Sequence, residues 1–487
     1  MNKPFRLLSI ALIAVVVLGL GAFWLGHSRS KGALAKYKAE LRARGEKLTW
    51  AELGYPRPPQ TNQSLTELVA AAGRLGNAKF EPGALALMNY VGPGRAEPGW
   101  AGPNPRFISN TSTGMAAVTW TEFGAAFQEV EPELADIRAA LENPPRYRFI
   151  QPSNYLNWPP LSFDQQRKAA QWLSGDTIRA LREHRLDEAR ENLHALTQLV
   201  HADENDPTII SQMIRVAIAN LALADTWEAV QAEGWREESL ASLQKNWESV
   251  ELVEGLETGM LGERAFGEAT FAYLRTAGSG ERIKFLRGTF GAGPVQLSSP
   301  EDYFQAYVVM PWWAANADAD EMFFLGYNQR SLDSVRKLRQ GVPWPDVSVE
   351  LGQQYAELNK VFGSQFGKFR YLFSGMMISS AQRAANTCVR TETQRRLTIT
   401  ALALVRYRLR AGKYPENLQV LVPDFLSAVP IDMMSAKHLC YRLNPDGSFV
   451  LYSVGEDGQD DGGDASSAGV TKRIDLWSGR DAVWPVA

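Results

Sequence analysis

Cysteine and histidine are scarce in this chain of 487 residues, which has two cysteines and five histidines. Two cysteines exclude a disulfide framework and a cysteine zinc site. We expect Cys388 to lie on a helix, roughly 36 Å before its end. Cys440 falls in a short strand that should pack nearer that end, so we do not expect the Cα atoms to come within the ~7 Å that a bridge needs. A single bridge in an oxidising compartment stays open as the alternative.

A strong excess of one charge is also absent. Lysine and arginine total 51, aspartate and glutamate total 54, and 45% of the residues are hydrophobic. This balance excludes a disordered chain and a strongly basic nucleic-acid binder, so we expect no nucleic-acid partner. The length suggests about two or three domains.

Complete catalytic motifs are missing as well. The segments Ser242–Lys245 and Ser334–Lys337 match Ser-x-x-Lys without the companion elements of serine acyltransfer enzymes. The segment Gly363–Lys368 is one residue short of a P-loop. Glu191 and His194 form one Glu-x-x-His, whereas di-iron bundles need two such motifs and two further glutamates. We therefore predict a protein that is not an enzyme; a hydrolase whose site is assembled from distant residues is the second alternative.

One long hydrophobic run stands out, because residues 7–25 carry no charge. As a helix this run spans roughly 28 Å, close to the hydrocarbon thickness of a bilayer. We predict a transmembrane anchor over 7–26, preceded by a short cytoplasmic tail over 1–6. The alternative is a cleaved signal peptide, but its apolar core is usually shorter, and Phe23, Trp24 and Leu25 stand where small residues belong.

The charges beside the run do not settle its orientation. Lys3 and Arg6 precede it, and six basic residues follow it: Arg29, Lys31, Lys36, Lys38, Arg42 and Arg44. The positive-inside bias favours a cytoplasmic body, but long domains translocate largely regardless of charge. We therefore expect a single-pass protein of the cytoplasmic (inner) membrane with the bulk of the chain extracytoplasmic. The basic stretch is interpreted either as a helix with Leu34, Tyr37 and Leu41 against headgroups or as a solvated linker helix.

Beyond the anchor we expect three regions and a mainly α fold. A loop-rich juxtamembrane region over 27–160 is followed by a helical bundle or hairpin domain over 161–378. Two apolar stripes at helical spacing indicate packed helices; they are Leu186, Ala189, Leu193, Leu196 and Val200, and Ile210, Ile214, Ala217, Leu221 and Ala224. Asp206 and Pro207 are typical of an N-cap and a first helical position.

The last region, 379–487, should be a small α+β C-terminal module. A long helix over 379–411 should end at Gly412, with Leu402, Val405 and Leu409 packed against a β-hairpin. The hairpin strands are expected at 438–443 and 448–454, around the turn Asn444–Gly447. A third strand is expected over 472–477.

The C-terminal segment resembles a known family. The motifs that carry the likeness are Gly412-Lys413-Tyr414-Pro415, Val429-Pro430-Ile431-Asp432 and Tyr452-Ser453-Val454-Gly455-Glu456-Asp457-Gly458. Their order over residues 395–480 resembles the periplasmic domain of the type II secretion major pseudopilin. That likeness implies a helix packed on a small antiparallel sheet with a calcium-binding acidic loop. Residues 1–25 lack the family's processing motif and its assembly glutamate, so filament formation is not implied.

The acidic loop is the strongest candidate site. The ten residues 455–464 hold five carboxylates and no base, and glycines let backbone carbonyls turn toward a hard cation. Asp457 matches the aspartate of the pseudopilin loop, and Asp461 and Asp464 are approximate counterparts. We predict a Ca²⁺ site there, with a solvated acidic turn as the alternative, and no other cofactor.

These observations favour a membrane-anchored envelope protein with a structural or protein-interaction role and an unknown protein partner. An accessory component of a type II secretion or pilus-like system is the first alternative. The whole layout also resembles uncharacterised bacterial membrane-anchored proteins, a likeness that implies no activity.

Overall fold

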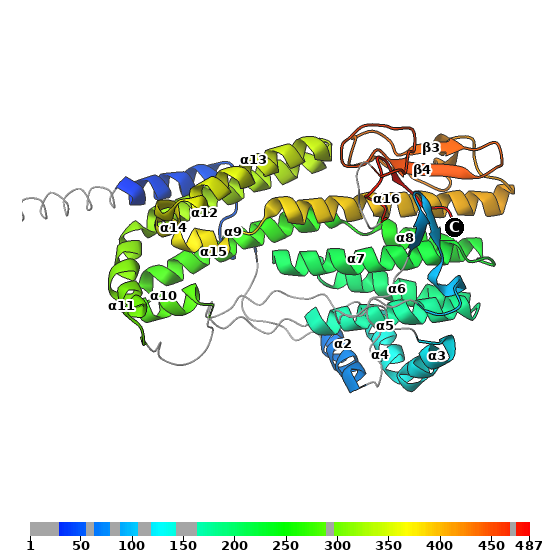
Figure 1. The fold of residues 1–487 in the computed structure, drawn as a ribbon, viewed down its shortest axis with the longest axis horizontal. Coiled ribbons are helices and arrows are strands. Elements are labelled where there is room, and N and C mark those ends of the chain that lie inside the picture. The colour runs from blue at the N-terminus through cyan, green and yellow to red at the C-terminus, as the bar shows by residue number, and fades with distance from the viewer. Residues whose placement is uncertain are drawn as a thin grey trace, which may run out of the picture.

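The computed structural model describes residues 29–54, 63–77, 88–105, 118–142, 163–288, 297–467 and 474–487. The expected anchor at 7–26 lies outside these residues. Figure 1 shows an elongated body, with the first described helix, residues 29–43, at one end and the C-terminal sheet toward the other.

The predicted mainly α fold with a small antiparallel sheet is confirmed. The labelled helices are α2 (Gln63–Arg74), α3 (Trp120–Glu129), α4 (Glu131–Glu142), α5 (Phe163–Arg182), α6 (Leu186–Ala202), α7 (Ile209–Val230), α8 (Glu237–Glu248), α9 (Leu252–Thr276), α10 (Ser279–Leu286), α11 (Pro300–Phe304), α12 (Met310–Arg339), α13 (Trp344–Gly363), α14 (Gln365–Arg370), α15 (Leu372–Met377) and α16 (Ala381–Ala411). Single turns are η1 (Leu75–Asn77), η2 (Gly99–Ala101), η3 (Gln305–Val309) and η4 (Leu418–Leu421). The strands are β1 (Asn89–Gly92), β2 (Arg95–Glu97), β3 (Cys440–Leu443), β4 (Phe449–Ser453) and β5 (Ala482–Val483).

Helices α5, α6 and α7 pack side by side, as expected for a helical bundle or hairpin domain. The stripe on α6 is buried: Ala189, Leu193, Leu196 and Val200 are at most 1% exposed. The prediction that the second stripe is the buried side of α7 is wrong, because Ile210 is 55% exposed and Ala217 is also exposed. α7 contacts helices on several sides, so its buried surface includes polar residues that periodicity alone does not reveal.

α7 is also the one helix among the described residues that is long and apolar enough to cross a membrane. Its most apolar window is 56% buried within the protein, which is typical of a core helix. Its N-cap is Thr208, whose hydroxyl accepts from the Ser211 amide, so the predicted cap at Asp206 and first helical position at Pro207 are wrong. Asp206 instead accepts the Thr208 amide at 2.9 Å and shapes the turn that leads into the cap.

The long helix α16 joins the helical body to the C-terminal sheet. It packs against α7, α8 and α9 and also contacts β4 and η4. It ends at Gly412, which adopts the predicted left-handed conformation with φ of 75°. Leu402 and Val405 are buried as expected, but Leu409 is 47% exposed, because the helix extends past its neighbours there. One core cluster includes residues of α7, α16 and β4 and therefore crosses the expected boundary at 379.

The C-terminal sheet has the order β3-β4-β5 and is antiparallel throughout. The predicted hairpin is present, with Cys440 opposite Tyr452 and Leu443 opposite Phe449. The third strand is not the expected one: residues 474–477 are not a strand, and Ala482–Val483 pairs with β4 instead.

The first described helix packs inward. Leu34 and Leu41 are 6% and 1% exposed, so the side interpreted as facing headgroups packs against the protein instead. Leu34 joins a second core cluster with Phe271, Trp313 and Phe373. This contact fixes the start of the described chain to the end of the body formed by α10–α12 and α15.

Candidate functional site

A cleft of about 320 Å³ opens where the body meets the C-terminal module. It lies between the first turn of α9, the end of α12, the middle of α16 and the loop before β3. Its charged lining residues are Glu251, Glu254, Arg339, Glu392, Arg396 and Asp432. Among the described residues that line this cleft there is no serine, cysteine or histidine.

α16 contributes Glu392 to the cleft, and the carboxylate of Glu392 is fully paired. Both oxygens of Glu392 accept from Arg395 at 2.8 Å, and Arg396 Nε donates to Oε1 at 2.7 Å. Burial raises the pKa of Glu392, but the two arginines outweigh it and hold the pKa below its usual value. Arg396 Nη1 also donates to the Ile431 carbonyl at 2.6 Å, which ties the loop of the module to α16.

Asp432 anchors the loop from the opposite side. Its carboxylate, fully buried, accepts from the Ser453 hydroxyl at 2.7 Å and from the amides of Met434 and Val454 at 3.0 and 3.1 Å. Burial raises the pKa of Asp432. The resemblance marked Asp432 as part of a motif, and the contacts give it a positioning role in the loop.

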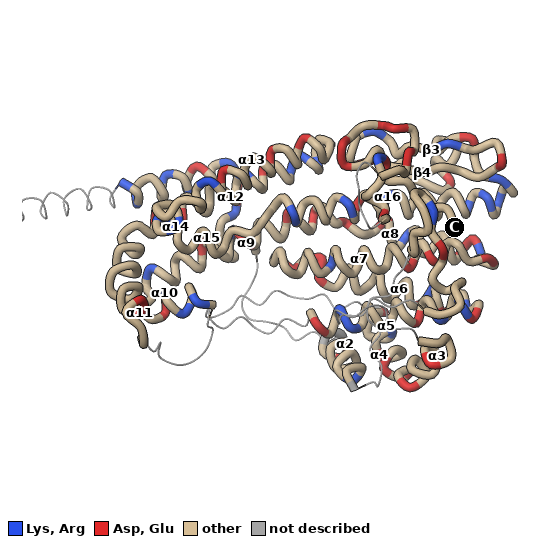
Figure 2. The backbone as a smooth tube through the Cα atoms, in the orientation of Figure 1, with Lys and Arg blue, Asp and Glu red and all other residues tan. Residues whose placement is uncertain are grey.

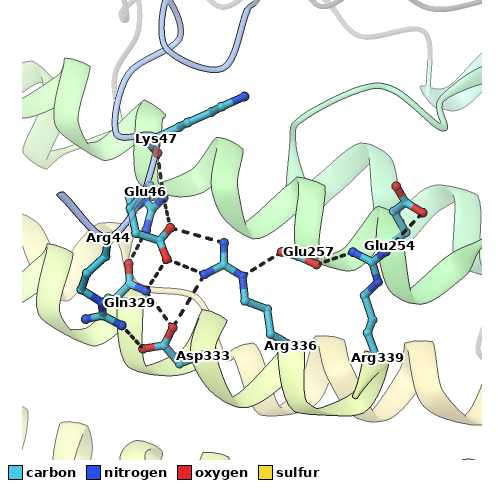
Figure 3. A network of polar contacts seen from close by, with 10 residues as sticks. Arg44, Glu46, Lys47, Glu254, Glu257, Gln329, Asp333, Arg336 and Arg339 are labelled. Atoms are coloured by element: carbon cyan, nitrogen blue, oxygen red, sulfur yellow. Dashed lines mark hydrogen bonds and ion pairs between the residues drawn. The ribbon is translucent and has the colours of Figure 1, made fainter. Parts of the chain in front are cut away.

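The third wall of the cleft is the end of a buried ion-pair network (Figure 3). Glu46 Oε2 lies 2.8 Å from Arg264 Nη2, and Glu46 Oε1 lies 2.5 Å from Arg336 Nη1. Gln329 donates to Glu46 Oε1 at 3.0 Å. The Arg264 side chain is 0% exposed and that of Glu46 is 7% exposed, so the pair is removed from water.

The network continues along α9 and α12 to the cleft. Arg336 Nε donates to Glu257 Oε1 at 2.8 Å, and Arg339 Nη1 donates to Glu257 Oε2 at 2.9 Å. Arg339 also lies 3.8 Å from Glu254, and both of these residues line the cleft. A chain of alternating charges thus connects the stretch after the first helix to the cleft, as Figure 3 shows.

The network fixes the charge state of its acids. Burial raises the pKa of Glu46, but hydrogen bonds from Arg336, Arg264 and Gln329 outweigh it and lower the pKa to about 2. Contacts with Arg336 and Arg339 likewise outweigh burial at Glu257 and lower its pKa. The stretch around Glu46 is distinguished in the sequence only by its glycine and aromatic residues, so Glu46 itself was not predicted to be part of a site. No sequence signal identifies partners more than 200 positions away.

The predicted calcium ligands Asp457, Asp461 and Asp464 are not among the carboxylates that lie in groups of three or more within 4.8 Å of one another in the described residues. Asp457 Oδ1 accepts the Gln459 amide at 3.0 Å and is exposed. Asp461 and Asp464 lie on either side of Arg480, at 3.9 and 3.8 Å. The Ca²⁺ site stays a prediction, and its ligands would have to leave these partners.

Asp481 organises the same loop and was missed by the sequence reasoning. Its side chain is 1% exposed, and Oδ2 accepts the amides of Gly463 and Asp464 at 2.7 and 3.0 Å. Burial raises the pKa of Asp481. Asp460, also not singled out, accepts from the Tyr452 hydroxyl at 3.0 Å. Acidic residues in this loop therefore bind donors of the protein itself.

Another acidic group gathers in the helical bundle. Carboxylate oxygens of Glu131, Asp176 and Glu188 lie within 4.8 Å of one another, the one such group found among the described residues. Three arginines pair with them, because Arg138 contacts Glu131 and Asp176, Arg179 contacts Asp176 and Glu188, and Arg185 contacts Glu188. These cations already supply the balancing charge, so the group is an ion-pair cluster.

Two motifs singled out in the sequence have structural partners. Ser334 and Lys337 of one Ser-x-x-Lys both bind Glu350, at 3.0 and 2.5 Å, and thereby clip α12 to α13. His194 of the Glu-x-x-His contacts the Asn246 amide at 3.0 Å, between α6 and α8. Both cysteines are free thiols, in agreement with the expectation that they lie apart.

A pair of buried aspartates lies in the α6–α7 connection. Asp203 and Asp206 are 2% and 0% exposed. Burial, and then the neighbouring Asp206, raise the pKa of Asp203 to about 7. Asp203 Oδ1 accepts from Gln166 at 3.4 Å, and its backbone carbonyl accepts from Gln212 at 2.9 Å. We therefore expect the stability of the fold to depend on the protonation of Asp203 near neutral pH.

Comparisons of the chain with family models, with curated proteins and with solved structures gave no match.

Proposed function

We propose that this protein is a membrane-anchored, extracytoplasmic protein of the cell envelope that binds a protein partner and has no catalytic activity. The observation that carries the proposal is the ion-pair network from Glu46 to the cleft (Figure 3). Glu46 follows the uncharged run at 7–25 by about 20 residues. It is joined to α9 by the buried Arg264 and to α12 by Arg336, whose side chain is 29% exposed.

A buried pair of this kind fixes geometry more than it adds stability. Removing two charges from water costs about as much as their attraction returns, but leaving one of them alone costs several kcal/mol. Arrangements that separate Glu46 from Arg264 and Arg336 are therefore rare. The body then keeps one orientation relative to the stretch after the run, as a protein that presents a surface at a fixed distance from a membrane requires.

The cleft is the surface that we assign to the partner. Its rim carries acidic side chains, of which Glu254 is 60% exposed, and arginines that are held by the body. Its lining residues include four acidic and two basic groups, an excess of negative charge that suits recognition of a basic protein segment.

Topology and binding are tested separately. Full-length protein should stay with membranes after a carbonate wash, and a reporter fused after Ala487 through a flexible linker should show an extracytoplasmic location. Recovery in the soluble fraction or a cytoplasmic signal would overturn the topology.

Partner binding is tested by a pull-down from solubilised membranes with the double variant Glu251→Lys and Glu254→Lys. A partner captured by wild type should be lost from this variant and kept by Glu357→Lys, whose side chain is 70% exposed on α13. Equal capture by all three proteins would remove the cleft from the proposal.

An accessory role in a type II secretion system is the alternative. It rests on the resemblance of residues 395–480, and the contact of α16 with β4 in an antiparallel sheet supports it. Co-purification of secretion-system components with the full-length protein would favour it over a general envelope role. Their absence from a complex that holds another partner would exclude it.

A further inference from the structure

Four large apolar side chains are exposed on one short stretch of helix. Tyr303, Phe304, Tyr307 and Val308 are 51%, 55%, 72% and 49% exposed. We call these four residues the aromatic cap. They belong to α11 and η3, which continue into α12 without a break, because the residues at both junctions are helical.

The cap is a rigid part of the fold. η3 is a turn of π-helix, and its inner residues Ala306 and Val309 are 5% and 8% exposed in the second core cluster. The rings of Tyr303 and Tyr307 stack on the outer side, with centroids 6.2 Å apart and an angle of 7° between them. Burial of the inner side holds the outer rings away from the body.

The cap lies at the end of the body where the first described helix packs. Leu34 belongs to the same core cluster as Ala306 and Val309, so the first helix and the cap share one support. Leu25 precedes Leu34 by nine residues. A chain of that length spans at most about 32 Å, so the covalent chain limits how far Leu25 can be from Leu34.

Exposed basic side chains lie on the first helix and on α14, at the same end of the body. Arg29, Lys31, Lys368 and Arg370 are exposed, and Lys36 has a side chain that is 80% exposed. Figure 2 shows blue segments along the first helix and α14 at this end. Tyrosines beside lysines and arginines are typical of the boundary between hydrocarbon and headgroups.

We propose that the aromatic cap lies in the interfacial layer of the membrane that holds the hydrophobic run, so that the body contacts the bilayer at a second point. This inference rests on the proposed membrane anchoring. A second copy of the chain fits the cap less well. Four half-exposed side chains offer on the order of 400 Å², about half of what each partner of a stable protein interface buries.

The test uses the full-length chain in vesicles of phosphatidylcholine and phosphatidylglycerol whose acyl chains carry bromine. Cys440→Ser removes the more accessible native thiol, because Cys388 is fully buried. A fluorophore is then attached at Tyr307→Cys or, as the matched control, at Leu409→Cys. Leu409 is 47% exposed and lies near the far end of α16. Bromine quenches fluorophores in contact with the acyl region.

We expect the protein to float with the vesicles and the fluorophore at position 307 to be quenched several-fold more than that at position 409. Flotation with equal quenching would overturn the membrane contact of the cap and leave the anchoring intact. Failure to float would overturn both. Concentration-dependent dimerisation that protects position 307 without quenching would assign the cap to a second copy and reject the lipid contact.

Discussion

Arg264 and Glu46 form an ion pair with 2.8 Å between Nη2 and Oε2, and their side chains are 0% and 7% exposed. The arginine belongs to α9 and the glutamate to the stretch after the first described helix. Arg264 Nη2 also donates to the Lys47 carbonyl at 2.7 Å, so it binds both the side chain and the backbone of that stretch. Loss of the carboxylate would leave a buried guanidinium with too few acceptors.

Glu46→Ala should therefore destabilise the protein by about 3–5 kcal/mol, the usual cost of leaving a buried charge unpaired. The measurement is denaturant unfolding of the full-length protein in detergent. Glu40→Ala is the control: it removes the partner of Lys36 in a pair with side chains 57% and 80% exposed, and should change stability by about 1 kcal/mol or less. Similar losses in the two variants would contradict a buried network.

The same residue predicts an acid limit. The folded-state pKa of Glu46 is about 2, below its ordinary value of 4.5, so its contribution to stability is fully present above pH 4.5. It is lost as the pH falls from 4.5 toward 2, because the unfolded chain takes up the proton first. Unfolding curves of wild type and Glu46→Gln across this range should converge at the acidic end. Parallel curves would count against the prediction.

Asp203 predicts the opposite slope near neutrality. Its folded-state pKa of about 7 lies above its ordinary 3.8, so the folded protein holds the proton more tightly. Stability should fall as the pH rises from 3.8 to 7 and then level off. Asp203→Asn, which keeps an acceptor for Gln166, should flatten this slope in melting experiments. Burial also raises the pKa of Glu228 and of Glu263 to about 7, so part of the slope remains in the variant. The assignment to Asp203 fails if the slope of the variant equals that of wild type.

Leu402 and Leu409 lie on the same helix, α16, but differ in burial, so their substitutions should differ in their effect on stability. Leu402 is 0% exposed, so Leu402→Ala should cost about 2–5 kcal/mol in the free energy of unfolding. Leu409 is 47% exposed and lies about two helical turns later, so Leu409→Ala should change the free energy of unfolding by about 0.5 kcal/mol or less. Comparable losses at both positions would mean that the end of α16 is covered in solution.

The predicted calcium site is tested on the full-length chain by melting in millimolar Ca²⁺ and in chelator. If the loop binds the ion, the melting temperature should rise with Ca²⁺, and Asp457→Asn should abolish the rise. Asp446→Asn, in the exposed turn of the hairpin, is the matched control and should keep it. Arg480→Gln should enlarge the rise by freeing Asp461 and Asp464. Identical melting in both solutions would leave the loop as a solvated turn.

Sequence patterns correctly predicted those structural features that depend on residues close together in the chain. The stripe of Ala189, Leu193 and Leu196 is buried because α6 has a single apolar side, and Gly412 ends α16 because glycine adopts a positive φ without strain. The hairpin of β3 and β4 follows from its alternating strands and the turn between them. Each of these features depends on residues that are close in sequence.

Features set by distant partners escaped prediction. Arg215 on α7 is only 2% exposed, and the carbonyls of Val200 and Glu251 accept hydrogen bonds from it at 2.8 Å. The residues next to Arg215 in the sequence do not indicate these acceptors. The stripe that includes Ile210 was wrongly predicted to be the buried side of α7, because the neighbours of α7 also come from distant parts of the sequence. In the candidate site, the loop of acidic residues was visible, but Asp481 and Arg480, which bind it, come from a later segment.

The separation of Glu46 from Arg336 also has a consequence in time. The two residues are 290 positions apart in the chain. At a synthesis rate of about 5–20 residues per second, a ribosome needs roughly 15–60 s to add the arginine after the glutamate. Throughout that interval the glutamate is hydrated and the stretch around it is not held by α12. The contact between Glu46 and Arg336 therefore forms late in synthesis, after any engagement of the hydrophobic run with a membrane.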